Sequence, residues 1–103
     1  MSTGRAVAFT READLAAVES PVAESVRRRV LDTLAAITAG YRMPGIDVTR
    51  DYARETHGGD AAPLLDGSGH RLSVAGATLA NATAANTLDI DDGHRDVKGH
   101  PAA

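Results

Sequence analysis

The abundance of alanine constrains the fold of this chain more than any other feature of its sequence. Twenty of the 103 residues are alanine, and valine, isoleucine, leucine and phenylalanine together also number twenty. Alanine favours helices, whereas the β-branched and aromatic residues that strands prefer are scarce. A β-sandwich or barrel is therefore disfavoured. The composition predicts one small, all-α domain whose helices pack closely through small side chains.

Charge and cysteine content exclude several classes of function. The formal net charge is -3, and the basic residues are arginines apart from Lys98, so we expect no nucleic-acid partner. Arg27 to Arg29 form the main basic run, which is typical of a solvated helix face. The chain has no cysteine, which excludes disulfides, thiolate metal sites and cysteine nucleophiles. Residues 1–10 lack the apolar core that a signal peptide has, and no apolar run approaches the roughly 20 residues of a membrane span. We therefore expect a cytoplasmic protein with no membrane partner.

The N-terminal part of the chain contains one strong helix signal. Residues 1–19 are expected to form a polar leader, with at most a helical turn or two between Ala13 and Glu19. Ser20 and Pro21 then suit an N-cap and a first helical position. Gly40 suits the C-terminal end, so we predict a helix over residues 21–39. Its apolar stripe has helical spacing and consists of Val22, Val26, Val30, Leu34 and Ile37.

Two further helices and a hairpin are predicted downstream. Asp47 or Thr49 can cap a second helix that runs to about His57. Glycines at 67 and 69 favour a turn between two short extended pieces, which predicts a hairpin-like segment rather than a phosphate loop. Ser73 can cap a third helix, whose apolar side would consist of Ala77, Ala80, Ala84 and Leu88.

A polar segment follows, with four of the fourteen acidic residues, two of the four histidines and the sole lysine. The residues alone leave three interpretations open. One is a divalent-metal site; another is an acid–base site in which carboxylates and histidine exchange protons; the third is a solvated loop. The metal site would use Asp89, Asp91, Asp92, His94 and His100, but its spacing matches neither a calcium loop nor a His-Glu-x-x-His helix. The segment reads Asp89-Ile90-Asp91-Asp92-Gly93-His94-Arg95-Asp96-Val97-Lys98-Gly99-His100-Pro101.

The stretch from Asn81 to His94, followed by Gly99-His100-Pro101, resembles the hallmark of the MmgE/PrpD family. That family includes 2-methylcitrate dehydratase, cis-aconitate decarboxylase and iminodisuccinate epimerase. Residues 30–34 and 39–40 are similar to the family's first long helix, and residues 64–80 to its hairpin and following helix. The resemblance implies that residues 20–103 are part of the family's N-terminal helical domain, truncated before the rest of that domain and a second domain. We therefore expect the chain to be an N-terminal fragment.

The resemblance also implies an activity. Members are lyases or isomerases, and the homodimers act on di- or tricarboxylates without a metal or organic cofactor; dehydration is the leading expectation for this chain. By position, Asp89 corresponds to the family's active-site aspartate and His100 to the histidine of His-Pro, so both are implied to be catalytic. The remaining polar residues are expected to bind substrate or position the loop, with Asp91 and Asp92 holding the loop. They are Asp91, Asp92, His94 and Lys98.

Three departures from the family pattern bear on the reaction. Gly93 replaces a hydroxyl residue of the decarboxylase branch, Asn86 replaces a histidine, and Ile90 replaces a phenylalanine. They argue against decarboxylation and leave dehydration or epimerisation open. The family's other catalytic groups lie beyond residue 103, so the chain alone is expected to be inactive. The alternative is a non-catalytic product, either a truncated remnant or a small helical interaction module.

Overall fold

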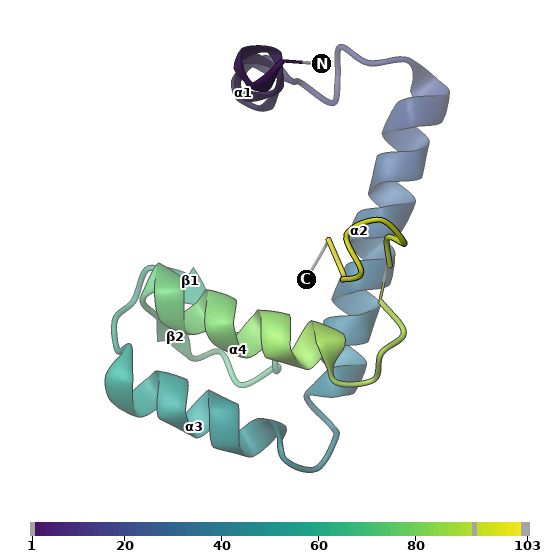
Figure 1. Ribbon diagram of the computed structural model, residues 1–103. Coiled ribbons are helices and arrows are strands. Elements are labelled where there is room, and N and C mark those ends of the chain that lie inside the picture. The colour runs from purple at the N-terminus through teal and green to yellow at the C-terminus, as the bar shows by residue number, and fades with distance from the viewer. Residues whose placement is uncertain (1, 92, 102–103) are drawn as a thin grey trace.

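The computed structural model describes residues 2–91 and 93–101. This part of the chain is mostly helical and carries one two-stranded antiparallel sheet, which confirms the predicted fold class (Figure 1). No helix in it is long and apolar enough to cross a membrane. The elements in chain order are α1 (Thr3–Glu12), α2 (Ser20–Gly40), α3 (Ile46–Thr56), β1 (Ala62–Pro63), β2 (Arg71–Leu72) and α4 (Val74–Asn86).

The start of the chain differs from the expectation. A helix, α1, lies upstream of the expected turn and has no buried residue; Ser2 caps it by accepting a hydrogen bond from the Arg5 amide at 3.4 Å. The segment between α1 and α2 holds only a turn, closed by the Ala17 amide on the Asp14 carbonyl at 3.0 Å. Figure 1 shows α1 standing apart from the other helices. Because none of its residues is buried, α1 has no apolar stripe facing a core, which is the pattern by which the other helices were predicted.

Helix α2 has nearly the predicted extent, but Ser20 is not its cap. The helix begins at Ser20, the cap position falls on Glu19, and no side chain caps it. Of the predicted apolar stripe, Ile37 is buried, whereas Val22, Val26, Val30 and Leu34 keep 40–53% of their surface exposed. The stripe therefore identifies the helix correctly, but most of it has no covering partner within the described part of the chain.

Helix α4 is the centre of the structure, because it packs against both α2 and α3. The alanines predicted for the apolar side of this helix are buried: Ala77, Ala80 and Ala84 are each at most 2% exposed. The closest approach is at Gly40, where an added Cβ would overlap the Ala84 carbonyl oxygen and lie 2.6 Å from its carbonyl carbon. Small residues thus let the two backbones touch. Two clusters make up the core, Ala53, Leu64, Leu72, Ala77 and Ala80 in one and Ile37, Ile46, Ala84 and Ala85 in the other.

The hairpin and the helix that follows it are confirmed, with smaller corrections at the helix ends. Strands β1 and β2 pair in the register Ala62 with Leu72, and the Ser73 hydroxyl caps α4 by accepting from the Gly76 amide at 3.2 Å. Helix α4 ends at Asn86, before the predicted Leu88. Asp47 and Thr49 were both predicted as the N-cap of α3, and both predictions are wrong. Gly45, with φ of 91°, occupies the N-cap position. Glycine adopts this left-handed conformation without steric cost, and no side-chain oxygen is needed.

Candidate active site

The chain segment after α4 turns back as soon as the helix ends. Thr87 Oγ1 donates to the Thr83 carbonyl at 2.6 Å, and the Asp89 amide donates to the Asn86 carbonyl at 3.1 Å. Asp89 has a φ of 53°, a left-handed conformation that is uncommon outside glycine but tolerated by aspartate. This backbone reversal places the Asp89 side chain where the loop begins.

A short internal pairing closes the loop between Asp89 and His100. The His94 amide donates to the Gly99 carbonyl at 3.0 Å, and the Lys98 amide donates to the His94 carbonyl at 2.9 Å. His94 Nδ1 also lies 3.3 Å from the Asp96 amide that donates to it, and Lys98 has a φ of 51°. His94 and Lys98 are exposed on this turn. Residues 94–99 thus form a closed turn, and the chain that leaves it brings His100 back to Asp89, where the loop began.

His100 consequently lies between two carboxylates. Its Nε2 is 3.0 Å from Asp89 Oδ1, and its Nδ1 is 3.1 Å from Asp91 Oδ1. The sequence had named Asp89 and His100 as catalytic and Asp91 as loop-positioning, and the structure brings all three together. Asp92 lies outside the described residues.

The two carboxylates have opposite environments. The Asp89 side chain is 84% exposed, whereas that of Asp91 is 0% exposed and that of His100 is 25% exposed. The close approach of Nδ1 to Asp91 lacks hydrogen-bond alignment, so both Asp91 oxygens and Nδ1 are buried without a hydrogen-bond partner among the described residues. A buried, unpaired carboxylate is costly, and a cationic imidazole beside it offsets that cost. His100 Nδ1 is thus buried beside Asp91, whereas Nε2 faces the solvent-exposed carboxylate of Asp89.

This arrangement suits proton chemistry better than metal binding. Asp89 and Asp91 lie against opposite nitrogens of the imidazole, so their oxygens do not converge on one point with it. Within residues 2–91 and 93–101, no three histidine, aspartate or glutamate side chains are placed to hold a metal ion. An imidazole flanked by carboxylates can donate from both nitrogens when it is cationic, and can accept a proton at one of them when it is neutral.

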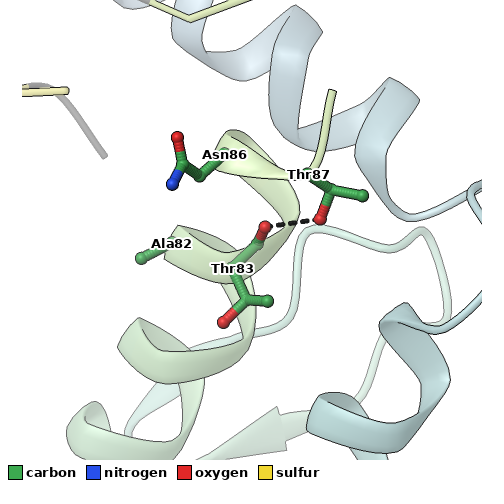
Figure 2. Close-up of a pocket in the computed structure, with 4 residues that line it drawn as sticks. All are labelled: Ala82, Thr83, Asn86 and Thr87. Carbon is green, nitrogen blue, oxygen red and sulfur yellow. Dashed lines mark hydrogen bonds between the residues drawn. The ribbon is translucent and has the colours of Figure 1, made fainter. Parts of the chain in front are cut away.

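A hollow lies on the face of α4 just before Asp89. It has a volume of about 460 Å³ and is lined by Ala82, Thr83, Asn86 and Thr87. Figure 2 shows the Asn86 amide projecting from the last turn of the helix, beside the Thr83–Thr87 hydrogen bond. Asn86 stands where the family pattern that the sequence resembles has a histidine. In the structure Asn86 lines this hollow.

Asn81 anchors α4 to the elements around it, and sequence reasoning missed this role. Its Oδ1 accepts from the Tyr41 hydroxyl at 2.7 Å and from the Leu65 amide at 3.0 Å, while its Nδ2 donates to the Pro63 carbonyl at 3.1 Å. Burial, followed by the negative charge of Asp66, raises the pKa of Tyr41 to about 12. An asparagine in the middle of an alanine-rich helix was the available signal, because a polar side chain in a packed face needs partners.

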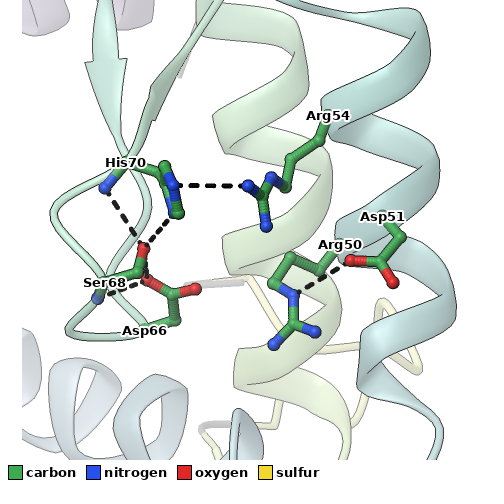
Figure 3. Close-up of polar contacts among 6 residues, drawn as sticks. All are labelled: Arg50, Asp51, Arg54, Asp66, Ser68 and His70. Atoms are coloured by element: carbon green, nitrogen blue, oxygen red, sulfur yellow. Dashed lines mark hydrogen bonds and ion pairs between the residues drawn. The ribbon is translucent and has the colours of Figure 1, made fainter.

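A second polar cluster, at the hairpin turn, has the composition but not the geometry of a catalytic triad (Figure 3). Ser68 Oγ donates to Asp66 Oδ1 at 2.6 Å, and His70 lies beyond the serine, with Nδ1 2.9 Å from the Ser68 oxygen. In a triad the carboxylate would orient the histidine instead. His70 Nε2 lies 3.3 Å from Arg54. Burial acts to raise the pKa of Asp66, but the Ser68 hydrogen bonds and Arg50 together outweigh it and lower that pKa. These hydrogen bonds hold the hairpin turn that the glycine pattern predicted.

Comparison with known proteins gives a family match. The model of the MmgE/PrpD N-terminal domain matches residues 5–103. This match confirms the resemblance that the Asp89–His100 segment indicated, and it extends the matched region upstream into α1. Searches of curated proteins and of solved structures found no match.

Proposed function

Because this chain belongs to the MmgE/PrpD family, we propose that it provides part of the active site of a cofactor-independent lyase or isomerase. The substrate would be a di- or tricarboxylate, and the reaction dehydration or epimerisation. The observation that carries the proposal is the placement of His100 between Asp89 and Asp91 at 3.0 and 3.1 Å. Residues from outside this chain would complete the site.

The chemistry of these groups supports such a reaction. Dehydration and epimerisation both begin by moving a proton at a carbon next to a carboxylate, and histidine exchanges protons near neutral pH. A cationic His100 would also attract the carboxylate of the substrate. Asp89 is exposed enough to meet that substrate, whereas Asp91 is not. Lys98, exposed on the same loop, supplies a positive charge that would attract an anion.

The family's homodimer is also a proposal for this chain, and so is the alternative of a helical interaction module. Both are supported by the uncovered apolar stripe of α2. Two shallow hollows follow that stripe, with volumes of about 490 and 250 Å³. Leu31 and Leu34 line the first, and Val26 and Val30 line the second with Leu34. An apolar helix surface of this kind is typical of a packing site for another helix.

Carboxylate binding tests the proposed function on this chain directly. We expect citrate and succinate to shift the backbone amide signals of the 89–100 loop in NMR spectra, with acetate as the weaker monocarboxylate control. His100→Ala should abolish the shifts, whereas His70→Ala, which alters the histidine at the hairpin turn, should leave them. Shifts that are equal for acetate and citrate, or that are unchanged in His100→Ala, would contradict the proposal.

Proton exchange tests the reaction type. In deuterated water, a competent site should introduce deuterium at the carbon next to a carboxylate of its substrate, as followed by proton NMR of the substrate. Because this chain supplies only part of the site, exchange is expected only when the residues that complete the site are also present. A completed site that binds its ligand without any exchange would favour the non-catalytic alternative. A concentration-dependent increase in mass by light scattering, lost on Leu31→Glu, would support the role of the α2 stripe in association.

A further inference from the structure

The two nitrogens of His100 have unequal roles, which can be inferred from the burial of their neighbours. Among the described residues, the charged groups within ion-pair distance of the imidazole are Asp89 at Nε2 and Asp91 at Nδ1. A cationic imidazole satisfies both carboxylates at once. A neutral imidazole has one proton, and that proton can serve one carboxylate only.

Solvent decides which carboxylate keeps the proton. Asp89, with 84% of its side chain exposed, can be hydrated when Nε2, 3.0 Å from its Oδ1, carries no proton. Asp91, with 0% of its side chain exposed and no hydrogen-bond partner for either oxygen among residues 2–91 and 93–101, has only the 3.1 Å approach of His100 Nδ1 to offset its burial. Removing the donor from the buried group therefore costs more free energy than removing it from the exposed one. The remaining proton should stay on Nδ1.

We propose that Asp91 is the positioning residue that holds the Nδ1 proton of His100, which makes Nε2 the atom that exchanges protons with a reactant. The second half of this statement rests on the proposed function, whereas the first half does not. A small rotation of either side chain would align the 3.1 Å approach into a hydrogen bond. Free neutral imidazole in a histidine prefers its proton on Nε2, so Asp91 reverses that preference.

The proton balance of a reaction at this site follows directly. When a C–H bond next to the substrate carboxylate breaks, its electron pair stays on the substrate and Nε2 takes the proton. The imidazole becomes cationic, and the negative charges of Asp89 and Asp91 stabilise it. In dehydration, Nε2 then gives the proton to the departing hydroxyl. In epimerisation, a second acid from outside this chain would deliver a proton to the opposite face of the carbon, and Nε2 would lose its proton to solvent. Nδ1 keeps its proton throughout, so the ring does not have to turn.

The tautomer of His100 can be read without any substrate. Long-range proton–nitrogen NMR spectra of histidine rings distinguish a protonated Nδ1 from a protonated Nε2, and they are recorded well above the usual histidine pKa of about 6.5. We expect the wild-type chain to show the Nδ1–H form of His100, with His94 as an exposed internal reference. An Nε2–H signal from His100 in the folded wild-type chain would overturn the proposal.

Two matched variants separate the carboxylates. Asp91→Ala should invert the tautomer populations of His100, from mostly Nδ1–H to mostly Nε2–H, whereas Asp89→Ala should leave them unchanged. Asp91→Leu repeats the test with the buried volume filled, in case the alanine variant loses its fold. An unchanged tautomer in a folded Asp91 variant would show that this residue only fills space. Because these spectra contain no carboxylate ligand, their outcome does not depend on whether citrate or succinate binds.

Discussion

The contact between α2 and α4 predicts that Gly40→Ala will be severely destabilising. A Cβ at this position would overlap the Ala84 carbonyl oxygen, and it would lie 2.6 Å from the carbonyl carbon and 3.1 Å from Cα of Ala84. These are backbone atoms, so no rotamer change can relieve the overlap. The helices would have to separate by about 1 Å to restore ordinary contact, and a gap of that size forfeits roughly a quarter to a half of each dispersion contact it opens.

The loss in the free energy of unfolding caused by Gly40→Ala can be estimated from two opposing contributions. Overpacking of a core costs about 1–3 kcal/mol, and a backbone-to-backbone overlap belongs at the upper end of that range. The higher helix propensity of alanine offsets at most about 1 kcal/mol. We therefore expect a net loss of about 2 kcal/mol in the free energy of unfolding. For a domain of this size, the melting temperature should fall by roughly 8–16 °C.

Thermal unfolding followed by circular dichroism measures this effect, and the chain offers a matched control. Gly4 lies within α1, and an added Cβ there meets nothing within 4 Å. Gly4→Ala should leave the melting temperature unchanged or raise it slightly, because alanine favours a helix by about 0.5–1 kcal/mol over glycine. If Gly40→Ala melted at or above the wild-type temperature, the close approach of α2 and α4 would be refuted.

Three further predictions concern polar groups around α4. Asn81→Ala should lower the free energy of unfolding in urea by about 2–3 kcal/mol, because it leaves part-buried partners of its amide unpaired; a change below about 0.5 kcal/mol would show that water replaces them. The phenol of Tyr41, whose pKa is about 12 because of burial and then Asp66, should ionise well above pH 10 in the folded chain, as followed by ultraviolet absorbance. Its raised pKa favours the folded state fully below pH 10, and this contribution is lost as the pH rises towards about 12; ionisation near pH 10 before unfolding would contradict the burial. Ser73→Ala should cost about 1 kcal/mol by removing the cap on the Gly76 amide, whereas Ser73→Gly should cost a few tenths, and equal melting temperatures for all three chains would refute the cap.

Local signals carried most of the successful fold prediction. The 3.6-residue spacing found α2, and the serine before the alanine run found the cap of α4, because each depends only on neighbouring residues. The failures occurred where several residues compete for one role. Pro21 and Ser20 both fall inside α2, and Gly45 displaced Asp47 as the start of α3 through its left-handed backbone. Sequence pattern does not rank such alternatives.

The candidate site was predicted by resemblance rather than by spacing. Residue types alone left a metal site, an acid–base site and a solvated loop open, and the family pattern selected Asp89 and His100. What neither source indicated is the burial of Asp91, since it depends on how the 94–99 turn folds back. Burial is a property of the tertiary structure, and it is what distinguishes the two carboxylates beside the histidine.

The alanine content and the site are connected through α4. Small side chains allow α4 to lie directly on α2 at Gly40 and Ala84, and the same helix ends at Asn86, just before Asp89 reverses the chain. The position of Asp89 is therefore set by backbone contact rather than by the rotamers of large side chains, which would allow more adjustment. A proton-transfer site tolerates little displacement, because donor and acceptor must stay within hydrogen-bond reach. The buried alanines of α4 contribute little apolar area to the core. They also fix the position of the helix after which the candidate catalytic loop begins.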